Sequence, residues 1–218
     1  MICGLAIAQY EHISPPFAEA SAHDPANIAL LCGGCHDRVT RGTWSKGRVL
    51  EARKCPVTFK QGFARDAFDF KDPFEVFFGD SRFRNVRCIV RKGNGDEWFT
   101  IDPPETPEGP PRLSARFFGP SGLPELEIRK NEWFCSTSVW DLKVEGKIIE
   151  VRGMDHHVML RLKARPPNGL EIQSLCMMVN DTGIIIKNDG SAHLRVDGTE
   201  INMASSDVTG ADAVFRVP

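Results

Sequence analysis

Apolar residues recur at every second position in much of the chain after Arg82, and this period most limits the fold. Successive side chains of a β-strand point to opposite faces, so a period of two indicates strands with one buried face. The clearest runs are Val86, Cys88 and Val90; Leu113, Ala115 and Phe117; and Val158, Leu160 and Leu162. The sequence therefore predicts an all-β domain over residues 82–218.

Short segments rich in glycine, asparagine and proline separate these runs at the spacing of strand connections. They are KGNGDE at 92–97, GPSG at 119–122, RPPNG at 165–169, KNDG at 187–190 and VDGT at 196–199. Residues 102–111, DPPETPEGPP, form a further loop, because proline lacks the N–H that a central strand donates. This spacing fits a sandwich, a barrel or a short β-solenoid, and the sequence does not choose among them.

Composition narrows the class of protein. The chain has 218 residues, of which 41% are apolar, enough for a buried core in one or two domains. It has no run of about 18 apolar residues and no charged N-terminal region before an apolar stretch, so we expect neither a membrane span nor a signal peptide. The seven cysteines are an odd number, which favours reduced thiols and metal binding over disulfides in a cytoplasmic protein.

Charge is distributed unevenly along the chain. From Arg38 to Lys60 there are seven basic residues and one acid, Glu51, a local charge of 7 − 1 = +6 where the total is −2. A concentrated basic segment is typical of a phosphate-binding face, although a solvated helix has the same composition. The basic residues are Arg38, Arg41, Lys46, Arg48, Arg53, Lys54 and Lys60.

The first forty residues contain metal-ligating side chains in a distinctive order. Cys3 is followed by Glu11 and His12, then by Asn27 beyond a proline-containing loop, and LCGGCH at 31–36 closes the set. Metal sites need several converging ligands, and a lone CxxC would mean little. The order, spacing and residue types together resemble the HNH nuclease family, which has the ββα-metal fold, over roughly residues 1–50.

The resemblance implies a role for each of four residues. Glu11 ligates a divalent ion, Mg²⁺ or Mn²⁺, and His36, on the following helix, is the second protein ligand. His12 is the general base that takes a proton from water, which suits an imidazole because its ordinary pKa is about 6.5. The ion offsets charge on the scissile phosphate and on the leaving oxygen. Asn27 supports the loop so that His12 keeps its orientation.

The resemblance also implies a second metal. Cys32 and Cys35, with Cys3, would bind a structural Zn²⁺ that fixes the helix start to the hairpin, as a domain of about 50 residues with a small core requires. The sequence departs from the family here, because the family supplies two cysteine pairs and this chain has only Cys3 upstream. Cys55, His23 and a solvent molecule are candidates for the fourth ligand; the alternative is that zinc is absent.

These features predict an α+β protein in three parts. Residues 1–60 form a small HNH domain, 61–81 a connector whose phenylalanines pack on one of the domains, and 82–218 the β-rich domain. The expected activity is hydrolysis of DNA phosphodiester bonds. The β domain would control target choice or assembly, including homo-oligomer formation, and family habit suggests defence against foreign DNA. The side chains expected on DNA are Arg38, Arg41, Lys46 and Arg48.

Two other functions fit the same residues. One is a zinc-containing nucleic-acid-binding protein that does not cleave, and the other is a ligand- or partner-binding β domain beside a vestigial HNH segment. Trp133 and Trp140 bear on the second, although aromatic residues of this kind are typical of cores and interfaces. The triplet Asp155, His156 and His157 has no companion metal ligands in the sequence, so we expect an ordinary turn or strand end there.

Overall fold

The computed structural model describes residues 1–203 and 205–218 and divides into two compact units. Unit 1 is Met1–Asp66 and unit 2 is Ala67–Pro218. The described part of the chain is mostly β, with 47% strand and 13% helix, which confirms that the α+β chain we expected contains a largely β domain. Among the residues described, none of the helices has the length and apolar character needed to cross a membrane.

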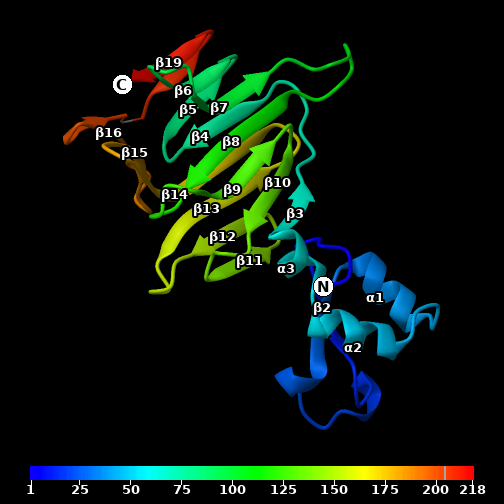
Figure 1. The fold of residues 1–218 in the computed structure, drawn as a ribbon. Helices are drawn as coiled ribbons and strands as arrows, with labels where there is room; N and C mark the ends of the chain where they lie inside the picture. Colours follow the sequence, from blue (N-terminus) through cyan, green and yellow to red (C-terminus); the bar gives the residue numbers. More distant parts are fainter. Residues whose placement is uncertain (204) are drawn as a thin grey trace. The chain divides into compact units, whose positions relative to one another are not determined.

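Unit 1, all of whose residues are described, combines a two-stranded antiparallel hairpin with three helices (Figure 1). The hairpin strands are β1 (Gln9–His12) and β2 (Ile28–Leu31), and the loop between them contains short 3₁₀ helices at Phe17–Glu19 and Pro25–Asn27. The helices are α1 (Gly33–Thr40), α2 (Lys46–Lys54) and α3 (Val57–Gln61). The small core contains Ile13, Ala29, Leu31, Cys32, Cys35, Val39 and Val49.

Side-chain caps determine where the first two helices begin. The Cys32 sulfur accepts a hydrogen bond from the Cys35 N–H at 3.4 Å at the start of α1. The Ser45 hydroxyl accepts one from the backbone N–H of the third residue of α2 at 3.3 Å. Caps of this kind satisfy N–H groups that the first turn of a helix leaves unpaired. They place His36 and Lys46 in the first turns of α1 and α2.

Unit 2 contains two sheets, and β3 (Phe63–Ala67) leads the chain into it. One sheet has the order β19 (Ala213–Val217), β6 (Cys88–Lys92), β7 (Glu97–Asp102), β8 (Arg112–Phe118), β9 (Pro124–Arg129) and β10 (Glu132–Ser136). The other runs in sequence order through β11 (Asp141–Glu145), β12 (Ile148–Arg152), β13 (Val158–Arg165), β14 (Gly169–Val179), β15 (Thr182–Ile186), β16 (Ala192–Val196) and β17 (Thr199–Asn202). It also includes β4 (Glu75–Phe78), β5 (Ser81–Arg84) and β18 (Asp207–Thr209).

The two sheets pack face to face, as the layers of strands in Figure 1 show. Phe78 of β4 meets Phe99 of β7 with ring centroids 4.9 Å apart. A cavity of about 10 Å³ is lined by Phe117 from the first sheet and by Leu160 and Leu175 from the second. Of the three architectures that the sequence left open, unit 2 therefore has that of a sandwich, with side chains of both sheets in one core.

The predicted turns and two of the three alternating runs are confirmed in this unit. The run at Val86, Cys88 and Val90 differs, because Val86 precedes β6 and Ile89 is buried together with both of its neighbours. In β8, Leu113, Ala115 and Phe117 are each at most 2% exposed while their neighbours are half-buried. All five glycine- and proline-containing segments join consecutive strands, and residues 103–111 form the loop between β7 and β8. Asp155–His157 lies in the turn between β12 and β13. Trp133 belongs to the core at 2% exposure, whereas Trp140 is 55% exposed.

Residues 61–81, which we expected to form a connector, include parts of several regular elements. They contain the end of α3, all of β3 and β4 and the first residue of β5. Phe70, Phe74 and Phe78 are at most 6% exposed, and the rings of Phe70 and Phe74 lie 4.6 Å apart. Residues 70–78 of the segment are therefore part of the sandwich core, in agreement with the expected packing of its phenylalanines on one domain. Each buried ring contributes on the order of 2 kcal/mol of apolar transfer free energy.

The last two strands, β18 and β19, lie in different sheets, as their partners β5 and β6 do. β18 pairs in parallel with β5, and β19 pairs in parallel with β6. Ion pairs reinforce both: Arg84 binds both carboxylate oxygens of Asp207 at 2.8 Å, and Arg91 binds Asp212 at 3.0 Å. Hydrogen bonds from Arg91 and a neighbouring arginine hold the pKa of the Asp212 carboxyl below its ordinary value.

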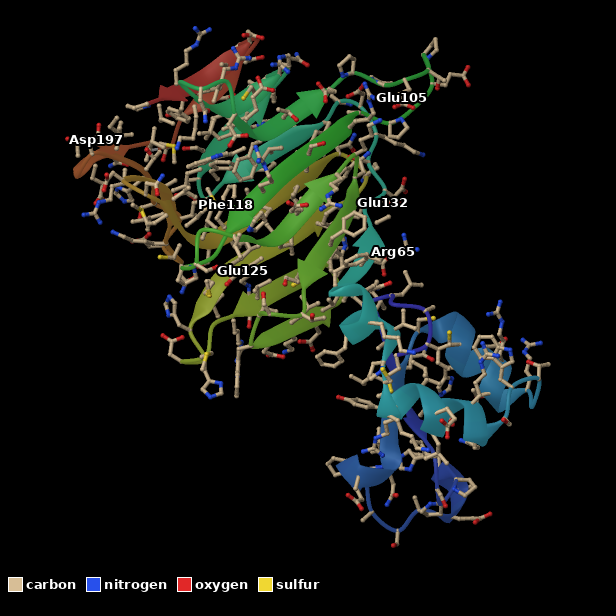
Figure 2. The ribbon with its side chains drawn as sticks, viewed as in Figure 1. Arg65, Glu105, Phe118, Glu125, Glu132 and Asp197 are labelled. Atoms are coloured by element: carbon tan, nitrogen blue, oxygen red, sulfur yellow. The ribbon has the colours of Figure 1, made fainter. Side chains whose placement is uncertain are left out.

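Glu125 of β9 lines the inter-sheet cavity, beside Phe118 of the neighbouring strand (Figure 2). Burial raises the pKa of the Glu125 carboxyl above its ordinary value of 4.5. The Glu125 charge, after burial itself, also helps to raise the pKa of the nearby Cys135 thiol to about 12. The folded state thus binds a proton at Glu125 more tightly than the unfolded chain does, and the contribution of that proton to stability is lost as the pH rises through the folded-state pKa.

Replacing Glu125 with glutamine is therefore expected to stabilise unit 2 at about pH 7.5 and to change little at about pH 4, where the carboxyl is protonated. Urea unfolding of wild type and variant at both pH values measures the difference. Glu108→Gln, which removes an exposed carboxylate from the loop between β7 and β8, is the matched control for net charge. An equal effect of Glu125→Gln at both pH values would contradict the assignment.

Candidate functional site

Glu11 and His12 are the last two residues of β1, and their side chains serve opposite faces of the hairpin. Adjacent strand residues alternate in direction, and across the hairpin Glu11 pairs with Ala29 and His12 with Ile28. Glu11 is 4% exposed and His12 is 8% exposed. Two polar side chains at this degree of burial need partners, because an unpaired buried polar group is costly.

The carboxylate of Glu11 lies between two groups from the helices. His36 Nε2 of α1 is 3.3 Å from Glu11 Oε2. The ammonium of Lys46, in α2, donates to Glu11 Oε1 and to the backbone carbonyl oxygen of His12. Lys46 therefore neutralises the buried carboxylate. The side chain of His36 is 31% exposed, so solvent can reach the contact between His36 and Glu11.

The imidazole of His12 has different partners, which come from the loop between β1 and β2. His12 Nε2 is 3.1 Å from His23 Nδ1, so one ring donates a hydrogen bond to the other. The ring of Phe17 packs edge-on against His12 with centroids 5.4 Å apart, and it stacks on His23 at 5.9 Å. The general base that we expected from the sequence thus lies among aromatic rings, on the opposite side of β1 from Glu11.

Asn27 connects the two ends of this loop. Its backbone carbonyl oxygen accepts a hydrogen bond from the N–H of Ile13, the residue after His12, at 2.9 Å. Its side-chain amide donates to Asp24 Oδ2 at 3.0 Å, and Asp24 directly follows His23. These contacts tie the strand end that bears His12 to the loop that bears His23.

Three cysteines, one near the N-terminus and two at the start of α1, form a cluster. The sulfurs of Cys3, Cys32 and Cys35 all lie within 4.8 Å of one another, and the first two are 3.2 Å apart. The three thiols are free, and 3.2 Å is far longer than an S–S bond of about 2.05 Å. In a tetrahedral zinc site with bonds of about 2.3 Å, ligand sulfurs are about 3.8 Å apart. The cluster could therefore hold a metal ion, and its thiol donor set suits structural zinc.

Proton affinities in the cluster are unequal. Burial and hydrogen bonding with Cys32 and Cys3 raise the pKa of the Cys35 thiol to about 12. Burial also opposes ionisation of Cys32, but hydrogen bonds from backbone N–H groups and from the neighbouring thiols outweigh it and lower its pKa. Cys32 is therefore the first of the two to carry the thiolate, and a metal would displace the remaining protons as it binds.

Neither of the two side chains considered from the sequence as a fourth zinc ligand joins the three sulfurs. His23 is hydrogen-bonded to His12, and exposed Cys55 lies outside the cluster. Across the part of the chain that the structure describes, no histidine, aspartate or glutamate joins the three sulfurs. A solvent molecule remains as the candidate that completes a four-coordinate shell.

The basic residues predicted to contact DNA fall into three situations. Arg38 and Arg48 are exposed and lie over the Trp44 ring, 4.9 and 4.0 Å from its centroid, so both cations are held at one aromatic side chain. Arg41 pairs with the carboxylate four residues earlier at 2.8 Å. Lys46 instead contacts Glu11, which differs from its expected place on the DNA-facing surface.

Sequence reasoning missed the parts that His23 and Lys46 play. The sequence suggested His23 only as a zinc ligand. Its hydrogen bond with His12, eleven positions earlier, could not be predicted because it depends on the path of the intervening loop. Lys46 is 35 residues from Glu11 in sequence. A lysine at the start of α2, in a segment otherwise rich in basic residues, carries no signal that distinguishes it from its neighbours.

Comparison of the chain with protein-family models, with curated proteins and with solved structures gives no match. The function must therefore be inferred from the site itself.

Proposed function

We propose that the protein is a metal-dependent endonuclease of the HNH type that hydrolyses DNA phosphodiester bonds. The observation that carries the proposal is the 3.3 Å approach of Glu11 and His36, from a hairpin strand and the helix that follows the hairpin. His12 directly follows Glu11, and the cysteine cluster lies at the start of the same helix. The hairpin, the helix that follows it and the residue order support a ββα-metal unit.

His12 would act as the general base, because it ends β1 and the twist of the strand end would let it serve the same phosphate as an ion held by Glu11. A neutral imidazole has one N–H and one free lone pair, and the partner of one nitrogen decides the state of the other. When His12 Nε2–H donates to His23 Nδ1, the Nδ1 atom of His12 is free to take a proton from water. His23 is then a positioning residue, because it selects the tautomer of His12 that can accept a proton.

Glu11 and His36 would hold the catalytic ion, Mg²⁺ or Mn²⁺. Magnesium commonly binds through one or two protein groups and completes its shell with water and substrate phosphate oxygens. Such an ion would offset negative charge that develops on the phosphate. Arg38 and Arg48 on Trp44 would bind flanking phosphates, so affinity should fall steeply with salt.

The test is nicking of supercoiled plasmid by the full chain with Mg²⁺, with Mn²⁺ and with EDTA. The proposal expects cleavage with either metal and none with EDTA. Absence of cleavage with both metals, in a preparation that binds DNA, would overturn it. Salt titration of binding gives the number of phosphate contacts from the slope.

The second candidate is a zinc-containing nucleic-acid-binding protein that does not cleave. The contact between Lys46 and Glu11 favours it, because an ammonium already neutralises the carboxylate that an ion would need. The plasmid assay separates the two candidates. The sandwich of unit 2 is proposed, in either case, to control target choice or assembly.

Replacing Lys46 with alanine is expected to strengthen metal binding. Its ammonium competes with a divalent ion for Glu11, so its removal should lower the Mn²⁺ concentration at half-saturation by about 3-fold to 10-fold. Loss of the free-Mn²⁺ electron paramagnetic resonance signal measures binding directly. Lys54→Ala, which removes a lysine paired with a glutamate on the same helix, is the control. Unchanged Mn²⁺ affinity in Lys46→Ala would place the ion elsewhere.

A further inference from the structure

A pocket of about 360 Å³ opens beside His12. It is lined by Tyr10, His12, Phe17, His23 and Ile28. Its volume lies within the range of small-ligand sites, roughly 300–1,000 Å³. Four of the five lining side chains are rings, and two of these are imidazoles that can donate or accept hydrogen bonds.

The rings form an open platform. Tyr10 is 74% exposed and Phe17 is 71% exposed, which is unusual for rings that line one pocket. Phe17 and His23 are nearly parallel, with an interplanar angle of 16°, while His12 stands edge-on to both. The platform therefore presents flat apolar faces to solvent immediately beside the proposed general base.

Local structure holds these rings in place. Tyr10 and His12 share one face of β1 because they are two residues apart, and Ile28 is the cross-strand neighbour of His12. The loop that bears Phe17 and His23 is secured where it meets α2. Arg53 donates to the backbone carbonyl oxygens of Ala26 and Pro25, residues that close this loop.

We infer that this pocket takes an unstacked nucleobase of the DNA strand that the enzyme cuts. The inference rests on the proposed function. Every base has a flat π-face, so exposed aromatic rings bind bases without sequence preference. Arg53, which belongs to the basic segment and contacts the loop that bears Phe17 and His23, supplies positive charge for the phosphates of the same strand. A base held against Phe17 would place its own backbone next to His12, and paired bases inside a duplex cannot reach the platform. The preferred substrate is therefore single-stranded or locally unpaired DNA.

The experiment compares two 20-nucleotide strands with the same phosphates, one of thymidines and one fully abasic, for binding to the full chain in EDTA at fixed salt. Base stacking should make the thymidine strand bind about 5-fold to 100-fold more tightly. Phe17→Ala and Tyr10→Ala should each reduce this ratio. Both rings are exposed, so neither change removes core packing. Phe59→Ala removes an equally exposed ring, 69%, from α3 of the same unit and should leave the ratio unchanged.

Equal binding of the two strands by the wild type would overturn the inference, as would a base-dependent ratio that survives both pocket substitutions. A ratio that falls equally in Phe59→Ala would also overturn it, since the effect would not belong to the pocket. These measurements need no cleavage. A protein that discriminates the strands but never nicks plasmid keeps the base pocket and loses the nuclease proposal. A protein that nicks plasmid but binds the two strands equally keeps the nuclease proposal and loses the base pocket.

Discussion

Replacing His12 with alanine is expected to reduce plasmid cleavage by about 10²-fold to 10⁴-fold, the usual contribution of a general base, while DNA binding is retained. His12 is 8% exposed, and its two close partners, His23 and Phe17, come from the loop rather than from the metal-binding side. Its loss should therefore leave Glu11, His36 and the exposed arginines in place. Initial rates of nicking and a binding isotherm, measured on the same preparation, provide the two readouts.

The matched control is His157→Ala, which removes a histidine from the turn between β12 and β13 in unit 2. It should cleave and bind as the wild type does. Substitution of His23 separates positioning from catalysis: His23→Ala should lower the rate less than His12→Ala. His23→Asn, which keeps a side-chain acceptor, should restore part of that loss. Unchanged cleavage by His12→Ala would contradict the role of His12, and any remaining activity would belong to another group.

Replacing Cys35 with serine is expected to abolish zinc binding and to unfold unit 1 while unit 2 stays folded. Cys35 is 3% exposed and belongs both to the sulfur cluster and to the small core of unit 1. Structural zinc contributes on the order of 10 kcal/mol of apparent binding free energy at neutral pH, more than a core of this size can supply. Zinc per chain by elemental analysis should fall from about one to near zero.

Limited proteolysis locates the loss of structure. The Cys35→Ser chain, and wild type treated with a strong chelator, should be cut throughout residues 1–66, and a resistant fragment beginning near Ala67 should remain. Cys55→Ser removes an exposed thiol from the same unit but outside the cluster, and it should retain zinc and resistance. Wild type that contains no zinc and resists protease equally with and without chelator would refute the structural site.

The sandwich was largely predictable, because its pattern is local. Alternation such as that of Leu113, Ala115 and Phe117 depends on a period of two, and glycine- or proline-containing turns determine where each strand ends. The choice of a sandwich over a barrel was not predictable. It depends on contacts such as that of Phe78 with Phe99, which join different sheets. The sequence of either strand alone does not indicate such a contact.

The approach of Glu11 and His36 was predictable from the sequence, and the contacts around it were less so. The order of Glu11, His12 and His36 indicated a shared site, and Glu11 does meet His36. Because side chains alternate along β1, His12 points to the other face of the strand. There it contacts His23, which belongs to a loop without a repeating sequence pattern. Lys46 reaches Glu11 from a second helix. Such pairings depend on loop paths and helix packing, which residue spacing does not encode.

The parallel pairing of β18 with β5 and of β19 with β6 has a consequence for synthesis on the ribosome. Each pairing joins residues about 125 positions apart, so these contacts form late and slowly. Until residues 207–217 have emerged, β5 and β6 each have an unpaired edge, one in each sheet. Such edges recruit other chains, so the nascent sandwich is most prone to aggregation while residues 207–217 are still inside the ribosome.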